Sequence, residues 1–257
     1  MKSITITLLI LFHQICYCQK QATTVQQVWL GNTSQARFSE KWGMSFDLQV
    51  RTRENFFKKV SQVSSRIGAV YYPNEMIRVS AGYYFADNVP RDYHNGVWQV
   101  EHTGWQQVAW SNKYPRLNIN QSVRLEERFR HRVKNELELG EGFGFNYRTR
   151  YNILMSIALG HLAFAPHSLS ATVYNEVYLN FGNQITYNTF DQYRIFTGFN
   201  YFFSKRASLL FGYMYSFQQL STGKSYRNLQ AARIFYLYNL DLRKKKTEQP
   251  KPVHDVS

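Results

Sequence analysis

Cysteine is almost absent from this sequence, and both copies, Cys16 and Cys18, lie near its start. They follow Lys2 and an apolar segment over 4–15 that is too short to span a membrane as a helix. A short positive region, an apolar core and small residues at the cleavage position are typical of a secretory signal peptide. We therefore predict a signal peptide at 1–18 that is cleaved after Cys18. The mature chain then lacks cysteine, which excludes disulfides, thiol chemistry and cysteine-based zinc sites.

Long hydrophobic runs and proline are also scarce. After the predicted signal peptide, no apolar run approaches the roughly 18 residues that a membrane helix requires. The chain has 6 prolines but 19 tyrosines and 19 phenylalanines, and these aromatics recur at every second position, as in β-strands. A mean hydropathy of −0.44 would exclude a helical membrane protein. It suits a transmembrane β-barrel, in which only every second residue faces lipid.

Alternating segments follow one another along the chain. We expect strands near 26–37, 42–53, 61–72, 76–86, 99–112, 116–129, 143–156, 169–181, 190–203, 206–218 and 227–242. Tight turns are expected at 38–41, 72–75, 113–116 and 203–206, and longer polar loops at 54–60, 87–98, 130–142, 182–189 and 219–226. Short turns on one side and longer loops on the other are typical of outer-membrane barrels.

The number of segments, eleven, conflicts with the even strand number of bacterial single-chain barrels. Either residues 20–28 hold a short additional strand, which gives twelve, or one segment is false, which gives ten. We favour twelve. The expected fold is thus all-β, an antiparallel transmembrane β-barrel of 10–12 strands over 19–243. A disordered, basic periplasmic tail is expected at 244–257.

The second face of the same strands is charged. Arg124, Glu126 and Arg128 share one parity, whereas Leu125 and Phe129 share the other. If the aromatic rows face lipid, the charged residues line an arginine-rich lumen. Arginine suits a confined space better than lysine, because guanidinium is weakly hydrated and pairs bidentately with carboxylates. The predicted lumen cluster comprises Asp47, Arg51, Arg53, Arg66, Arg78, Glu101, Arg124, Glu126, Arg128, Arg148, Arg150, Glu176, Arg194, Arg233 and Asp241.

Two interpretations of this cluster stay open. A two-residue turn at Tyr114-Pro115 would place Glu101 opposite Arg128, which favours a salt-bridge lattice that fills a narrow lumen and makes the barrel structural. The excess of arginine favours instead a narrow pore or binding barrel for small anionic solutes.

A third interpretation is an outer-membrane enzyme that modifies lipids. The same turn would place His102 opposite Glu127 on the outward face, and a histidine–carboxylate dyad is the orienting half of a hydrolase triad. No nucleophile accompanies the dyad, because Gly104 is the next outward residue and Ser122 points inward. A catalytic role for the dyad is therefore only an alternative hypothesis.

The net charge of +14 bears on the partners of an exported protein. It favours phosphorylated lipid head groups and anionic solutes over nucleic acid. We expect outer-membrane lipids and lipopolysaccharide around the protein, and the barrel-assembly machinery as its folding partner. No metal or cofactor is expected, because 92–94 offers too few convergent ligands and the glycine-rich stretch 140–144 precedes a strand rather than a helix.

Several short motifs carry a family resemblance. They are Gln27-Val-Trp-Leu-Gly31, Glu101-His-Thr-Gly-Trp-Gln-Gln107, Arg124-Leu-Glu-Glu-Arg-Phe129, Phe145-Asn-Tyr-Arg-Thr-Arg150, Asp191-Gln-Tyr-Arg194 and Phe211-Gly-Tyr-Met214. With these motifs the chain, from about 27 to 243, resembles an uncharacterised "domain of unknown function" family of outer-membrane β-barrel proteins in Gram-negative bacteria. The resemblance implies a barrel in the bacterial outer membrane and assigns no catalytic residue.

Overall fold

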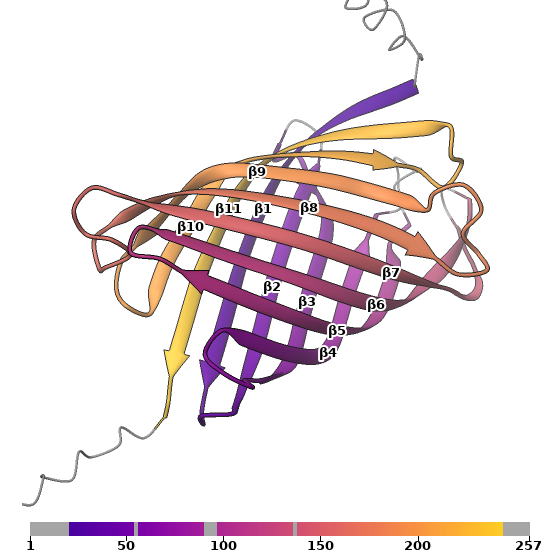
Figure 1. Cartoon of the computed structure of the whole chain (residues 1–257). Helices are drawn as coiled ribbons and strands as arrows, with labels where there is room; N and C mark the ends of the chain where they lie inside the picture. Colours follow the sequence, from indigo (N-terminus) through magenta and orange to yellow (C-terminus); the bar gives the residue numbers. More distant parts are fainter. Residues whose placement is uncertain (1–20, 54–55, 90–96, 136–137, 244–257) are drawn as a thin grey trace, which may run out of the picture.

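The computed structural model describes residues 21–53, 56–89, 97–135 and 138–243, and its regular elements there are all β-strands. The eleven strands are β1 (Gln21–Arg37), β2 (Trp42–Arg53), β3 (Lys59–Tyr71), β4 (Ile77–Asn88), β5 (Gln99–Lys113), β6 (Leu117–Asn135), β7 (Glu138–Leu159), β8 (Leu169–Phe181), β9 (Phe190–Phe202), β10 (Ala207–Gln219) and β11 (Ser225–Asp241). They form one closed barrel in which sequential strands are neighbours and β1 meets β11 (Figure 1). In the described part of the chain, no helix is long and apolar enough to cross a membrane.

All eleven predicted segments correspond to strands, whereas the preferred count of twelve is wrong. Residues 21–28 extend β1 instead of forming a separate strand. The barrel closes with an odd number because β1 and β11 run parallel, in register from Gln21↔Ser225 to Arg37↔Asp241. The other neighbouring strands pair antiparallel. The predicted signal peptide and the predicted tail lie outside the described residues.

The alternation of connection lengths holds only in part. Strands β6 and β7 pair as far as Asn135↔Glu138, so the loop predicted at 130–142 is wrong. The charged residues there suggested a loop. The β6–β7 hairpin extends past its neighbours, and charged side chains on such an extension do not prevent its two strands from pairing. Conversely, β7 and β8 are joined by the long connection 160–168 at the end of the barrel that carries the tight turns. We call this end the tight-turn end.

The burial pattern is inverted relative to that of an ordinary soluble protein. Large apolar side chains lie exposed on the outer wall, for example Phe46 at 44%, Ile67 at 46% and Tyr213 at 46%. Charged side chains are buried inside, for example Glu126 at 3%. The inner face also holds an apolar cluster: Trp29, Tyr174, Phe196, Leu210, Met214, Leu229, Ala231 and Phe235.

Paired glycines make room for large aromatic residues in the lumen. Gly198 and Gly212 are cross-strand partners, and a Cβ on Gly212 would lie 2.3 Å from the Thr197 carbonyl oxygen and 3.0 Å from the Phe196 ring. Gly68 supports Trp105 in the same manner, with a virtual Cβ 2.5 Å from the indole. These glycines let the rings of Phe196 and Trp105 lie close to the backbone, where a side chain on the glycine would otherwise stand.

Candidate ionic site in the barrel interior

The hairpin of β5 and β6 sets the geometry of the interior, and its predicted register is wrong by two residues. Lys113 pairs with Asn118, and the Tyr114 N–H donates to the Leu117 carbonyl at 2.8 Å. The central residues of the turn are therefore Pro115 and Arg116. Proline suits the first central position of such a turn and is disfavoured at the second, where the predicted turn placed it. A shift of two residues leaves every side chain on its predicted face.

The pair Glu101 and Arg128 forms across this hairpin even though the two residues are not directly opposite. Glu101 faces Arg130, and Arg128 reaches it diagonally. The Arg128 guanidinium donates to both carboxylate oxygens of Glu101, at 2.9 and 2.8 Å. Thr103 adds a hydroxyl hydrogen bond to the same carboxylate at 3.1 Å. This bidentate geometry is the strong form of an arginine–carboxylate contact.

A second group of charges surrounds Arg148. Its guanidinium donates to Glu126 at 2.7 Å and to Asp191 at 3.2 Å, and Arg124 lies 3.8 Å from Glu126. Asp191 is not among the predicted lumen residues, because strict alternation from Arg194 places it outside. The pairing of β8 and β9 shifts between Tyr178 and Leu179, and Asp191 is 1% exposed. A β-bulge of this kind redirects a side chain to the opposite face.

A third group is centred on Glu176 in β8. One of its carboxylate oxygens accepts hydrogen bonds from Tyr174 and Tyr178, each at 2.5 Å. Arg150 lies 3.1 Å from the carboxylate and Arg194 3.5 Å from it. Both tyrosines flank Glu176 on its own strand face, so local alternation alone supplies two of the four partners.

The remaining predicted lumen residues divide between the interior and its ends. Asp47 and Arg66 form an ion pair at 3.3 Å, and Arg78 donates to Gln35 at 3.4 Å. Arg53 lies at the end of β2, opposite Lys59. Asp241 does not join the interior: it is exposed at the tight-turn end, where Arg243 donates to it at 2.6 Å. Arg51 and Arg233 contact aromatic rings instead of carboxylates.

The proposed dyad of His102 and Glu127 is not assembled in the structure. His102 faces Phe129 across the hairpin, its Nδ1 contacts the Tyr83 hydroxyl, and its ring packs on Phe85 and Phe143. Glu127 faces Gly104 instead. No hydrogen bond joins His102 to Glu127 in the described part of the chain. The pair is separated because the turn is centred on Pro115 and Arg116, which shifts the pairing of β5 and β6 by two residues from the predicted one.

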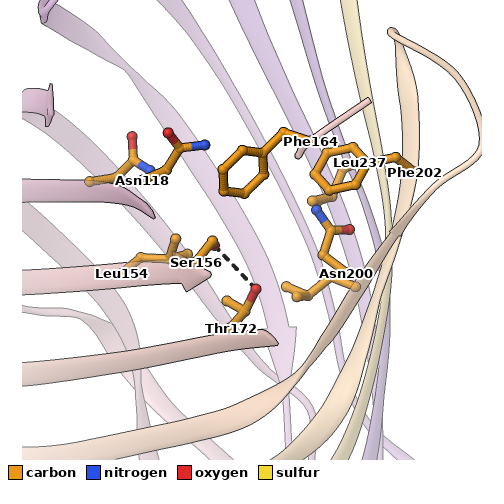
Figure 2. A pocket seen from close by; sticks show the side chains of 10 residues that line it. Asn118, Leu154, Ser156, Phe164, Thr172, Asn200, Phe202 and Leu237 are labelled. Atoms are coloured by element: carbon orange, nitrogen blue, oxygen red, sulfur yellow. Dashed lines mark hydrogen bonds between the residues drawn. The ribbon is translucent and has the colours of Figure 1, made fainter. Parts of the chain in front are cut away.

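A cavity of about 200 Å³ lies inside the barrel toward the tight-turn end. Figure 2 shows Phe164, from the long connection 160–168, beside Asn118 and Asn200, and the Ser156–Thr172 hydrogen bond of 3.1 Å below them. The lining is a mixture of amides, hydroxyls and apolar side chains and contains no charged residue: Asn118, Asn120, Leu154, Ser156, Phe164, Thr172, Asn200, Phe202, Leu210 and Leu237. Across the described residues, no three His, Cys, Asp or Glu side chains gather to hold a metal ion.

The fold and its interior define a closed β-barrel of eleven strands with an arginine-rich ionic lumen. The chain belongs to the family described as "Protein of unknown function (DUF2490)", whose model matches residues 26–227. The match runs from β1 into the beginning of β11. No curated protein and no solved structure matches the chain.

Proposed function

We propose that this protein is an integral β-barrel of the bacterial outer membrane with a closed, salt-bridged lumen and a structural role. The observation that carries the proposal is the inverted burial, with an apolar outer wall around a charged interior. An apolar wall exposed to water on every strand would drive aggregation, whereas lipid satisfies it. The predicted signal peptide supports export, and the predicted partners are outer-membrane lipids with lipopolysaccharide.

The closed lumen is supported by how its side chains interlock. Arg148 bridges Glu126 and Asp191, which belong to different strands. Trp105 and Phe196 fill the space above the paired glycines and are 3% and 1% exposed. Barrels of this size have little interior room once long side chains enter. Ions in water would have to displace these contacts in order to cross.

The test is conductance together with membrane insertion. Protein refolded into liposomes is expected to float with the lipid, to resist added protease and to give no current steps in planar bilayers. The double variant Glu126→Ala/Arg148→Ala removes the central bridge, and we expect it to conduct, which provides a positive control for insertion. Failure to float would refute the membrane role, whereas steps in the wild-type protein would refute the closed lumen.

A narrow anion-favouring pathway is the second candidate, because lumen arginines outnumber lumen carboxylates. The carboxylates are Asp47, Glu101, Glu126, Glu176 and Asp191. The arginines beside them include Arg51, Arg66, Arg124, Arg128, Arg148, Arg150, Arg194 and Arg233. A surplus of positive charge in a lumen favours anions. Current steps with an anion-selective reversal potential would replace the closed-barrel proposal by this one.

A further inference from the structure

Two lumen arginines lie on either side of one residue at the seam where the barrel closes. Trp29 of β1 has Arg51 of β2 as its antiparallel partner and Arg233 of β11 as its parallel partner. Because directly paired residues point to the same face of a sheet, both guanidiniums accompany the buried indole into the lumen. The paired arginines around Glu126 and Glu176 differ from this pair, because each of those pairs flanks a carboxylate.

Both arginines are supported by aromatic rings and have no carboxylate partner among the described residues. The guanidinium carbon of Arg51 lies 3.6 Å from the centre of the Trp29 ring, and its guanidinium donates a hydrogen bond to Gln49 at 3.2 Å. The guanidinium carbon of Arg233 lies 4.2 Å from the centre of the Phe235 ring. The Arg233 side chain makes no hydrogen bond or ion pair with another residue in the described part of the chain. The Nε atoms of both arginines are buried and lack a hydrogen-bond partner among the described residues.

The neighbouring charges increase this imbalance. Arg194 also lies over the Trp29 ring, 5.1 Å from its centre, so a third positive charge stands near Arg51. The charge of Arg194 is balanced by an ion pair with Glu176 at 3.5 Å. Glu176 also forms an ion pair with Arg150, so it balances two arginines at once. The indole N–H of Trp29 is already donated to Gln27 at 2.6 Å. Within the described part of the chain, Arg51 and Arg233 are therefore two positive charges that form no ion pair with a carboxylate.

This arrangement is suited to a ligand with several acceptor oxygens. Stacking on an aromatic ring uses the face of a guanidinium and leaves the N–H groups in its plane available. Two such forks match the oxygens of a tetrahedral oxyanion better than they match a spherical halide. Two charges also match a dianion. We propose that Arg51 and Arg233 form a binding site for a phosphate-type dianion, either free or as the phosphate group of a small solute.

The test uses the full-length protein folded in detergent, so it does not depend on membrane insertion. Calorimetric titration with inorganic phosphate is expected to show saturable binding, with sulfate competing and chloride competing poorly. Arg51→Gln and Arg233→Gln each remove one charge-assisted fork, so each should weaken phosphate binding about tenfold or more. Arg233→Lys keeps the charge but not the fork and should lose less affinity than Arg233→Gln.

A matched control separates this site from general electrostatics. The double variant Arg78→Gln/Arg206→Gln removes two positive charges far from Trp29 and should keep phosphate affinity within about twofold of wild type. The Arg233 side chain donates no hydrogen bond within the described barrel, so Arg233→Gln is expected to fold and decides the question if Arg51→Gln does not. A purely structural role predicts that Arg233→Gln is destabilised equally with and without phosphate. Our inference predicts that only the phosphate-dependent rise in the unfolding midpoint is lost.

Two results would overturn the inference. One is the absence of saturable phosphate and sulfate binding to the folded wild-type protein. The other is an equal loss of binding in the control and in the Arg233→Gln variant. A protein that binds phosphate in detergent but fails to enter liposomes would refute the proposed membrane role and leave the anion site standing.

Discussion

Glu176 offers the sharpest test of the ionic interior. We expect Glu176→Ala to destabilise the barrel strongly, because it leaves Arg150 and Arg194 in a buried site without their carboxylate. It also removes the acceptor of the Tyr174 and Tyr178 hydroxyls, each 2.5 Å away. Removing one partner of a buried ion pair costs about 3–5 kcal/mol. Each unsatisfied hydroxyl adds roughly 1–3 kcal/mol unless it finds another partner.

Arg194 limits the total, since it keeps its contacts with Tyr178 at 2.6 Å and with Gln192 at 3.2 Å. We therefore expect a loss of about 4–6 kcal/mol in the free energy of unfolding, near the upper end of the ion-pair range. Glu176→Gln keeps one oxygen for the tyrosine hydroxyls, but it loses the charge and places an amide NH2 group toward an arginine donor. Its cost should therefore be smaller than that of Glu176→Ala but still about 3 kcal/mol. The measurement is urea unfolding of the refolded protein, followed by tryptophan fluorescence.

The control is Glu138→Ala, which removes a carboxylate from an exposed ion pair instead of a buried one. Glu138 pairs with Lys134 at 3.1 Å, but their side chains are 55% and 65% exposed. An exposed pair of this kind contributes at most about 1 kcal/mol. If Glu176→Ala costs no more than Glu138→Ala, the buried network does not hold the interior, and the reasoning behind the closed lumen fails.

Three further changes test other parts of the structure by the same unfolding assay. Arg128→Ala leaves Glu101 buried and unpaired and should cost about 3–5 kcal/mol, with partial recovery in the charge-reversed pair Glu101→Arg/Arg128→Glu. Gly212→Ala forces a Cβ against backbone and should cost about 1–3 kcal/mol; a neutral result would contradict the close approach of β9 and β10. Glu75 lies in the turn between β3 and β4. There, a hydrogen bond from Arg37 lowers the pKa of Glu75 below its ordinary value of 4.5. That contribution, about 1 kcal/mol or less because the pair is exposed, is present above pH 4.5 and disappears as the pH falls through the lower folded pKa. Glu75→Gln should therefore lose stability at neutral pH but not at low pH.

The features that could be predicted from the sequence are those that depend on alternation. Each strand was located because outward aromatics and inward charges follow a period of two, and an error of two residues preserves both faces. The lumen positions of Glu101, Arg128 and Glu176 follow from parity alone. Their partners do not, because pairing depends on register, and register depends on the conformation of one turn around Pro115.

The features that escaped prediction depend on contacts between distant parts of the chain. Asp191 enters the lumen through a bulge against Tyr178, and a bulge leaves no trace in the alternation of a single strand. The cavity in Figure 2 depends on Phe164, whose connection contains no periodic signal. The prediction of twelve strands was wrong because it assumed the even strand number of other barrels. This barrel closes with eleven strands because β1 and β11 pair in parallel.

That parallel seam can be tested directly with a disulfide. Leu30 and Ile234 are direct partners and are 43% and 42% exposed on the outer wall, so cysteines there leave the lumen intact. Neighbouring strands lie about 4.8 Å apart, within the Cα separation that a disulfide accepts. Leu30→Cys/Ile234→Cys should therefore cross-link under mild oxidation, giving a mobility shift on gels that reductant reverses. In the control Leu30→Cys/Leu240→Cys, the second cysteine lies six register positions away, about 20 Å along the strand. A cross-link only in the control, or in neither variant, would exclude the parallel closure and reopen the case for a twelfth strand between β1 and β11.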